Sequence, residues 1–395
     1  MKPSSHKDWE GLGDLIVLAT DRLTTPVEDV HHALTDRWST LAGPWRESAR
    51  KTSRAVTTPI YQSIRLTGLG VGRAISFWAS TKAGSNALRP LWQSRRGSEV
   101  QAFFNGLWGD ELDRQESNLS IEMSLRTATG DPIEPNAPAL TKAFPAATSR
   151  LVLLLHGLGD TEHAWRGKEL EDNSEHNLAD ALADHSLTPL LVRYNSGLEV
   201  AANGFALSVL LEKIVNVWPV QVDEISLVGH SMGGLIALNA ILTADSSQQW
   251  ANKVVHVVTL GAPHLGAPLE KAVHMAATAL DQTPEGRPIG QFLEQRSAGI
   301  KDLRFGTDDA ITDPSRAVQY HFVAGAVTSE PDNIIGKMLG DLIIPVASAT
   351  GKGRTRTVTA DNVRVMGGRN HRALLHDPDV HQEIMTWLTG NAGMT

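Results

Sequence analysis

The sequence predicts an α/β fold in which helices flank a mostly parallel sheet. Over residues 101–395, short apolar runs alternate with segments of helical spacing, which is typical of parallel strands joined by right-handed crossovers. One apolar run leads into a glycine-rich pentapeptide and then into a second apolar segment, as where a strand turns sharply into a helix. With 395 residues, 41% of them hydrophobic, the chain is long enough for a large domain and an accessory region.

The first hundred residues are expected to form a helical extension outside that sheet. Val27, Val30 and Leu34 recur at helical spacing, and six of the ten tryptophans precede residue 110. Residues 1–100 contain 14 Lys and Arg against 9 Asp and Glu, whereas residues 101–395 contain 22 against 35. The extension therefore has two interpretations: it docks on the acidic remainder of the chain, or it contacts an anionic membrane surface.

Taken in order, the other elements begin with an edge strand. Strands are expected within Asn118–Thr127 and at Leu151–Leu155, Leu190–Arg193, Ile225–Val228, Val254–Leu260, Val318–Val323 and Val363–Met366. Asn203 is expected to cap a long helix, and Asp377 with Pro378 to start the last one. Residues 264–314 change to amphipathic helical spacing and predict a cap, or lid, inserted over the active site.

Several classes of protein and site are excluded or disfavoured by composition. The chain has no cysteine, so it has no disulfide, thiolate metal site or cysteine nucleophile. Neither a phosphate-binding nor a dinucleotide-binding glycine motif is present, and no histidine pattern fits a metal site, so no cofactor and no metal are expected. No signal peptide and no run of about 18 uncharged apolar residues stands out. A cytoplasmic protein is expected, with peripheral membrane contact as the variant.

The pentapeptide Gly229-His230-Ser231-Met232-Gly233 fits the G-x-S-x-G pattern of a nucleophile elbow. At such a turn the central serine projects outward, and the flanking glycines stand where a Cβ would collide with neighbouring backbone. Ser231 is therefore predicted to be a nucleophile. The alternative is a glycine-rich turn with a capping serine.

A serine hydroxyl needs a base to take its proton, and the base needs a carboxylate to orient it. In this architecture the acid and then the histidine follow the serine along the chain. His371 lies in the loop after the Val363–Met366 strand and is the predicted base, whereas His376 and His381 are expected at the surface.

Asp341 is the predicted acid, because it lies beyond the strand that ends near Val323. Asp332 is the alternative. Asp308 and Asp309 precede that strand and are less well placed.

The tetrahedral intermediate also requires an oxyanion hole. One backbone N–H should come from Met232, which follows the nucleophile, and the other from the loop after the Leu151–Leu155 strand. Leu158, between two glycines that allow close approach, is the predicted second donor. His156 is expected to hold this loop in place rather than to act in catalysis.

Together these segments resemble the α/β-hydrolase lipases and esterases over about residues 100–395. They resemble in particular the branch that is similar to the GPI inositol-deacylases and bacterial triacylglycerol lipases. The matching stretches are His156–Gly159, Gly229–Gly234, Gly261–Pro268, Asp341–Ala349 and His371–Leu375. Leu342 stands where the family's acid loop usually has glycine. The resemblance implies an α/β-hydrolase fold and a Ser231–His371–Asp341 triad.

The expected function is hydrolysis of carboxylic esters, as in a carboxylesterase or a lipase of lipid metabolism. The apolar insertion at 264–314 favours a small-molecule substrate with an acyl chain, and nothing indicates nucleic acid as a partner. Two alternatives remain: an acyltransferase that uses the same triad, and a non-catalytic binding protein that keeps the fold.

Overall fold

The computed structural model describes residues 5–39, 46–81, 94–166, 177–245, 247–267, 296–307, 317–330, 340–353 and 356–390. These residues form two compact units. The first unit holds the described residues of Met1–Gly97 together with Glu111–Ser120 and Arg296. The second unit holds Ser98–Asp110 and the described residues of Ile121–Glu270 and Ser297–Thr395.

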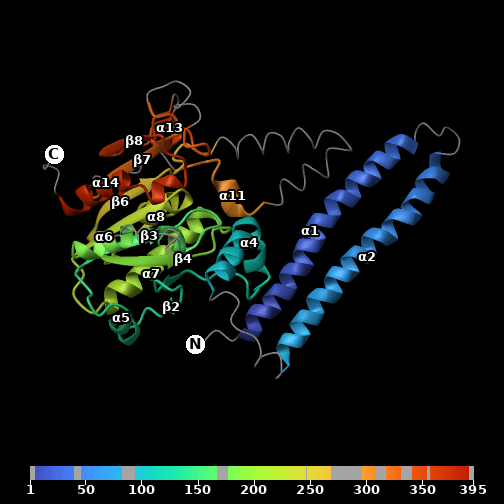
Figure 1. The fold of residues 1–395 in the computed structure, drawn as a ribbon, viewed down its shortest axis with the longest axis horizontal. Helices are drawn as coiled ribbons and strands as arrows, with labels where there is room; N and C mark the ends of the chain where they lie inside the picture. Colours follow the sequence, from blue (N-terminus) through green and yellow to red (C-terminus); the bar gives the residue numbers. More distant parts are fainter. Residues whose placement is uncertain are drawn as a thin grey trace. The chain divides into compact units, whose positions relative to one another are not determined.

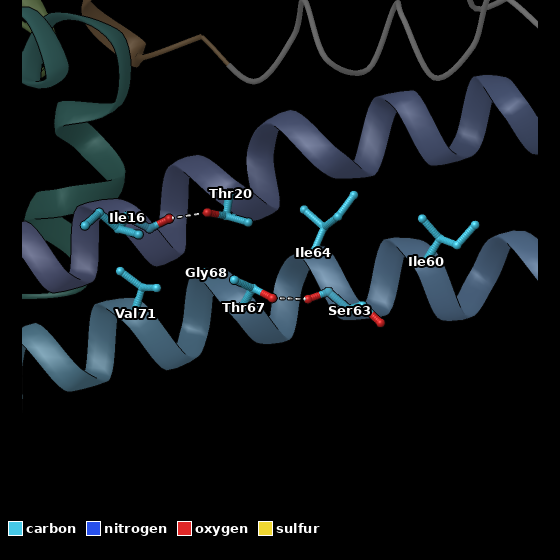
Figure 2. Close-up of a pocket in the computed structure, with 8 residues that line it drawn as sticks. All are labelled: Ile16, Thr20, Ile60, Ser63, Ile64, Thr67, Gly68 and Val71. Carbon is cyan, nitrogen blue, oxygen red and sulfur yellow. Dashed lines mark hydrogen bonds between the residues drawn. The ribbon is translucent and has the colours of Figure 1, made fainter.

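The first unit is built on two long helices, α1 (Ser5–Ser39) and α2 (Arg46–Ser80), which form an antiparallel hairpin (Figure 1). The backbones come very close, because a Cβ added to Gly72 would lie 2.5 Å from the carbonyl oxygen of Gly13. Figure 2 shows the same pair of helices near Gly68. Gly68 and Gly72 do not interrupt the helix, and their lack of a side chain lets α1 pack closely against α2.

The second unit contains a sheet of eight strands in the order β2-β1-β4-β3-β5-β6-β7-β8 (Figure 1). The strands are β1 (Ser124–Arg126), β2 (Pro132–Ile133), β3 (Arg150–Leu155), β4 (Thr188–Arg193), β5 (Glu224–His230), β6 (Val254–Leu260), β7 (Gln319–Ala326) and β8 (Asn362–Gly367). Strands β3 to β8 pair in parallel, whereas β1 pairs antiparallel with β2 and β4. The predicted α/β fold is confirmed. The strand predicted at the edge, within Asn118–Thr127, is not at the edge, because β2 pairs with the outer side of β1.

Helices α7 and α8 lie on one face of this sheet, and α6 and α14 lie on the other. The helices that follow α2 in the chain are α4 (Arg95–Arg114), α5 (Ala137–Ala143), α6 (Leu178–Asp184), α7 (Val200–Val217), α8 (Met232–Thr243), α11 (Ala298–Asp302), α13 (Val346–Ala349) and α14 (Pro378–Thr389), with short 3-10 turns at Glu162–Arg166, Ala251–Lys253 and Ala373–Leu375. Leu153 of β3 packs in one core with α7 and α8, and Leu154 packs in the other with α6 and α14. This alternation buries β3 on both faces, as its continuous apolar sequence predicted.

Two predicted details of the helices have different outcomes. Asp377 caps α14, because its side chain accepts hydrogen bonds from the N–H groups of Asp379 and Val380. The cap predicted at Asn203 is wrong: α7 begins at Val200, and Asn203 lies inside its first turn. The Asn203 amide instead donates to the carbonyl oxygen of Asn195 at 2.9 Å, which ties α7 to the preceding loop.

The predicted cap insertion lies mostly outside the described residues, which cover only 264–267 and 296–307 of it. Within the part that is described, α11 begins at a capping Ser297. Among the described helices, α7 alone is long and apolar enough by length and composition to cross a membrane. Its residues Leu207, Leu211 and Ile214 are buried against the sheet, as in a core helix.

Candidate active site

Ser231 lies at the centre of the sheet, between the end of β5 and the start of α8. Its φ of 53° and ψ of −120° fall in a region that side-chain-bearing residues rarely adopt, and such backbone costs on the order of 1–3 kcal/mol. Its N–H donates to the carbonyl oxygen of Leu260 at 2.8 Å, which anchors the turn to β6. Ser231 therefore has the strained strand-to-helix geometry of a nucleophile elbow.

The two glycines of the pentapeptide make this turn feasible. A Cβ on Gly229 would lie 2.4 Å from the backbone of Gly233, and a Cβ on Gly233 would lie 2.4 Å from the carbonyl oxygen of Leu155. Real Cβ contacts are never this short, so both positions require glycine.

His371 and Asp341, predicted as base and acid, are in direct contact. The Nδ1 of His371 and Oδ2 of Asp341 are 2.6 Å apart, and the N–H of His371 donates to the backbone oxygen of Asp341 at 3.0 Å. Asp341 is 1% exposed and His371 8%, so bulk water barely screens the pair. Asp332, the alternative acid, lies outside the described residues.

The loop that carries Asp341 holds its carboxylate from the other side. Oδ1 accepts the N–H groups of Ile343 at 3.0 Å and Ile344 at 2.8 Å, which leaves Oδ2 for His371. Leu342 occupies the position at which the lipases and esterases that the sequence resembles usually have glycine, and its φ is +81°. The loop thus keeps a backbone conformation that favours glycine while carrying leucine there.

The imidazole of His371 lies beside the elbow. A Cβ on Gly261 would be 3.0 Å from both Nδ1 and Cε1 of His371. Gly261 directly follows Leu260, whose carbonyl oxygen accepts the N–H of Ser231. The His230 Nε2 is also 3.0 Å from the backbone oxygen of His371. Segments far apart in the sequence therefore meet around Ser231. The two other histidines near His371 in the sequence are placed differently. His376 is exposed, and a ring nitrogen of His381 lies 2.9 Å from the backbone oxygen of Leu375.

The loop after β3 also reaches the elbow, because a Cβ on Gly157 would lie 3.3 Å from the Cβ of Ser231. Leu158 follows in this loop. Met232 is the first residue of α8, where a backbone N–H has no acceptor within its own helix. The two predicted oxyanion donors thus belong to segments that border Ser231.

His156 holds the loop in the way that the sequence suggested, and its tautomer follows from its partners. The N–H of Tyr194 donates to His156 Nε2 at 3.3 Å, so the ring proton is on Nδ1, which donates to the Gly157 oxygen at 2.8 Å. Burial lowers the pKa of His156 to about 4, so the ring stays neutral. Because the Gly157 oxygen and the Leu158 N–H belong to one planar peptide, this bond orients that N–H.

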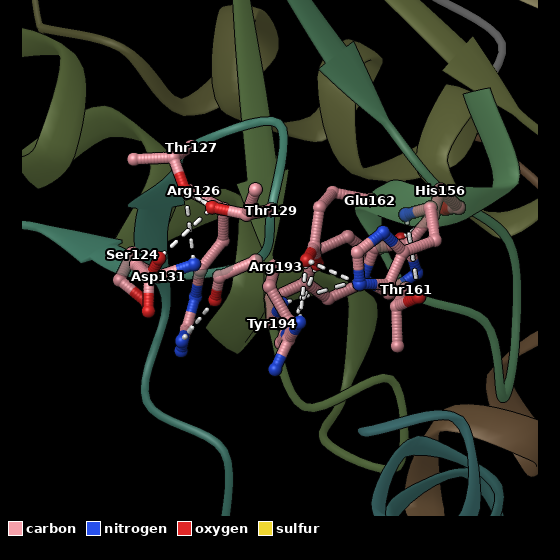
Figure 3. A network of polar contacts seen from close by, with 12 residues as sticks. Ser124, Arg126, Thr127, Thr129, Asp131, His156, Thr161, Glu162, Arg193 and Tyr194 are labelled. Carbon is pink, nitrogen blue, oxygen red and sulfur yellow. Dashed lines mark hydrogen bonds and ion pairs between the residues drawn. The ribbon is translucent and has the colours of Figure 1, made fainter. Parts of the chain in front are cut away.

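Figure 3 shows the buried ion pair that lies beyond this loop. Arg193 at the end of β4 forms a two-pronged contact with Glu162, with Nε to Oε2 at 2.6 Å. Both side chains are almost fully buried. Sequence reasoning missed the pair, and the signal for it was a lone arginine that ends the apolar run of β4. The pair ties the segment after Gly159 to the sheet.

A further ion pair connects the loop after β3 with the loop that carries His371. Asp160 lies next to the loop after β3, and its Oδ1 is 3.5 Å from Nη1 of Arg372, the neighbour of His371. Burial raises the pKa of Asp160, and Arg372 opposes that shift. No group of three or more His, Asp or Glu side chains that could hold a metal ion occurs within the described ranges.

Buried neutral histidines predict that stability falls in acid. Burial lowers the pKa of His156 to about 4 and that of His264 to about 3, from 6.5. Above pH 6.5 these groups are neutral in both states. Below it the unfolded chain binds more protons, so stability falls as the pH falls towards 4 and 3, by up to roughly 3 kcal/mol for His156 and roughly 5 kcal/mol for His264.

Calorimetry from pH 7 to pH 4 measures this effect as a fall in Tm. His264→Gln, which cannot be protonated, should show a smaller fall, whereas His185→Gln at an exposed position should behave as wild type. An identical pH profile for wild type and His264→Gln would contradict the assignment.

A model of the alpha/beta hydrolase family matches residues 152–383, which include Ser231, Asp341 and His371. No curated protein matches the chain in sequence.

Several solved structures are similar in fold. A thermophilic esterase from Thermogutta terrifontis is 15% identical, with 62% of this chain and 91% of that chain covered and a TM-score of 0.39. A lipase-esterase related protein from Clostridium acetobutylicum is 14% identical, with 61% and 95% covered and a TM-score of 0.38. The carboxylesterase CesB from Bacillus subtilis is 14% identical, with 62% and 85% covered and a TM-score of 0.36.

Proposed function

The chain belongs to the alpha/beta hydrolase family, and from that premise we propose that it is a serine hydrolase of carboxylic esters. The observation that carries the proposal is the 2.6 Å contact between His371 and Asp341 beside a strained Ser231. A serine, a histidine and a buried carboxylate in this relation are the parts that acyl transfer requires.

In the proposed mechanism, Ser231 Oγ attacks the ester carbonyl while His371 Nε2 takes its proton. Asp341 keeps the imidazole proton on Nδ1 and stabilises the imidazolium that forms. The N–H groups of Leu158 and Met232 bind the negative oxygen of the tetrahedral intermediate. His371 then protonates the departing alcohol. Water, activated by the same histidine, cleaves the acyl-enzyme.

The substrate class that we propose is an ester with an acyl chain, as in the lipases and inositol-deacylases that the sequence resembles. Support comes from α4, since a Cβ on Gly106 would lie 3.0 Å from the Cα of Gly159 in the loop after β3. Phe103, one turn earlier on α4, is 54% exposed, and its ring meets that of Phe104 edge-on at 5.5 Å. An exposed aromatic surface beside the oxyanion loop suits a hydrocarbon chain.

Phe103→Ala is expected to lower kcat/KM for p-nitrophenyl octanoate about tenfold more than for p-nitrophenyl acetate. The loss reflects apolar contact that only the longer chain makes. Val220→Ala is the matched control. This exposed side chain precedes β5, and so lies at the amino-terminal end of the strand whose other end leads to Ser231. Equal losses for both esters would argue against Phe103 as part of the acyl site.

Two other functions fit the same fold, and product analysis separates them. An acyltransferase would form a new ester when an alcohol acceptor is added to the p-nitrophenyl ester assay. A hydrolase would still release mainly the free acid. A non-catalytic binding protein would release no p-nitrophenol with any acyl chain length.

A further inference from the structure

The exposed surface of α2 is unusually apolar for a helix that meets solvent. The exposed side chains include Phe77 at 73%, Leu66 at 65% and Ile60 at 54%. Ile64, Val71 and Trp78 are also exposed. At about 100° per residue, these six positions occupy an arc of roughly 160° around the helix. We call this arc the apolar face of α2.

The apolar face continues into a groove along the hairpin. Figure 2 shows Ile60, Ile64 and Val71 of α2 beside Ile16 and Thr20 of α1, all of which line the groove. The side-chain hydroxyls that line the groove donate hydrogen bonds to backbone oxygens of their own helices. Thr20 Oγ1, for example, donates to the Ile16 oxygen at 2.7 Å. The hairpin thus presents apolar surface that water hydrates poorly.

The stretch of chain that carries this face has charges of one sign. From Arg50 to Gly97 the sequence contains nine Lys and Arg and no Asp or Glu. Arg65 is turned inward, where it pairs with Glu28 at 2.5 Å and with Asp21 at 3.3 Å. Arg73, by contrast, is exposed. At 100° per residue it lies about 20° from Leu66 around the helix, just outside one edge of the arc. An apolar face with an exposed arginine at its edge suits the surface of an anionic bilayer.

We propose that the apolar face of α2 is the surface by which this protein lies on an anionic lipid bilayer. Ile60, Val71 and Phe77 enter the boundary between head groups and acyl chains, and Trp78 lies at the level of the head groups. Arg73 contacts lipid phosphates. The inference does not depend on the chemistry of Ser231, and its readout is binding rather than hydrolysis.

A second copy of the chain is the other occupant that such a face could have, and charge disfavours it. Two identical faces would bring one all-basic segment against another, without an acidic residue between positions 48 and 98 to offset the repulsion. The arc is also wider than the two positions per seven residues that a packed pair of helices covers.

Sedimentation of the full chain with vesicles tests the proposal. We expect binding to vesicles of phosphatidylcholine mixed with phosphatidylglycerol, weaker binding in high salt, and little binding to phosphatidylcholine alone. Ile60→Glu and Phe77→Glu should each weaken the partition coefficient by about tenfold, because each removes apolar surface and places an acid at the bilayer. Phe77→Ala should weaken it as well, without a change of charge.

Gln62→Glu is the matched control. It adds the same charge to an exposed position of α2 outside the arc, and it should keep most of the binding. Circular dichroism checks that each variant is folded. Absence of binding at low salt, or an equal loss in Gln62→Glu, would overturn the proposal. The proposal would also be overturned if the wild type does not bind vesicles but forms a dimer without lipid, and Phe77→Glu converts that dimer to a monomer.

Discussion

Replacing Ser231 by alanine is expected to lower kcat for p-nitrophenyl ester hydrolysis by about a millionfold, the size of effect seen when a serine nucleophile is lost. The fold should survive, because the strained turn depends on Gly229, Gly233 and the N–H of Ser231 rather than on its hydroxyl. Alanine keeps that N–H. Stopped assays at high enzyme concentration measure the residual rate.

Ser226→Ala is the matched control for this loss. Ser226 is also buried in β5, five residues before Ser231, and lies away from His371 along the strand. Near wild-type activity in Ser226→Ala with collapse in Ser231→Ala supports the nucleophile. Substantial turnover by Ser231→Ala would exclude it.

Asp341→Asn should reduce kcat by about ten-thousandfold. Asparagine keeps the oxygen that accepts the N–H groups of Ile343 and Ile344, so the loop should fold as before. Its NH₂ group, however, would face His371 Nδ1 and donate to it. The imidazole proton would then move to Nε2, which could no longer take the proton of Ser231.

Two comparisons make the Asp341 result decisive. Asp332→Asn changes the alternative acid and should remain close to wild type. The double variant Asp341→Asn with His371→Ala should lose little more than His371→Ala alone, because residues that act as one unit do not contribute additively. A nearly normal Asp341→Asn beside an inactive Asp332→Asn would reassign the acid.

The elbow and the strand that leads into it were predictable from sequence because their signals are local. Ser231, Gly229 and Gly233 are neighbours in the chain, and their steric requirements follow from one turn. The contact of His371 with Asp341 was predictable only through the expected order of strands, which places both loops at one edge of the sheet.

Features that depend on distant segments were not predictable in the same way. Glu162 and Arg193 form a buried pair across 31 positions, and neither residue type indicates its partner. Asn203 was misread as a helix cap, because its amide binds the preceding loop instead. The exposure of Phe103 and Phe77 also needed the structure, since spacing alone cannot separate a buried face from an exposed one.

The nucleophilic role of Ser231 is tested most directly by a fluorophosphonate probe followed by mass spectrometry of the digested protein. The account predicts one adduct, on the peptide that contains Ser231. No adduct should form in Ser231→Ala, and a much slower one should form in His371→Ala, because the base is missing. An adduct on another residue, or labelling of Ser231→Ala at the wild-type rate, would contradict it.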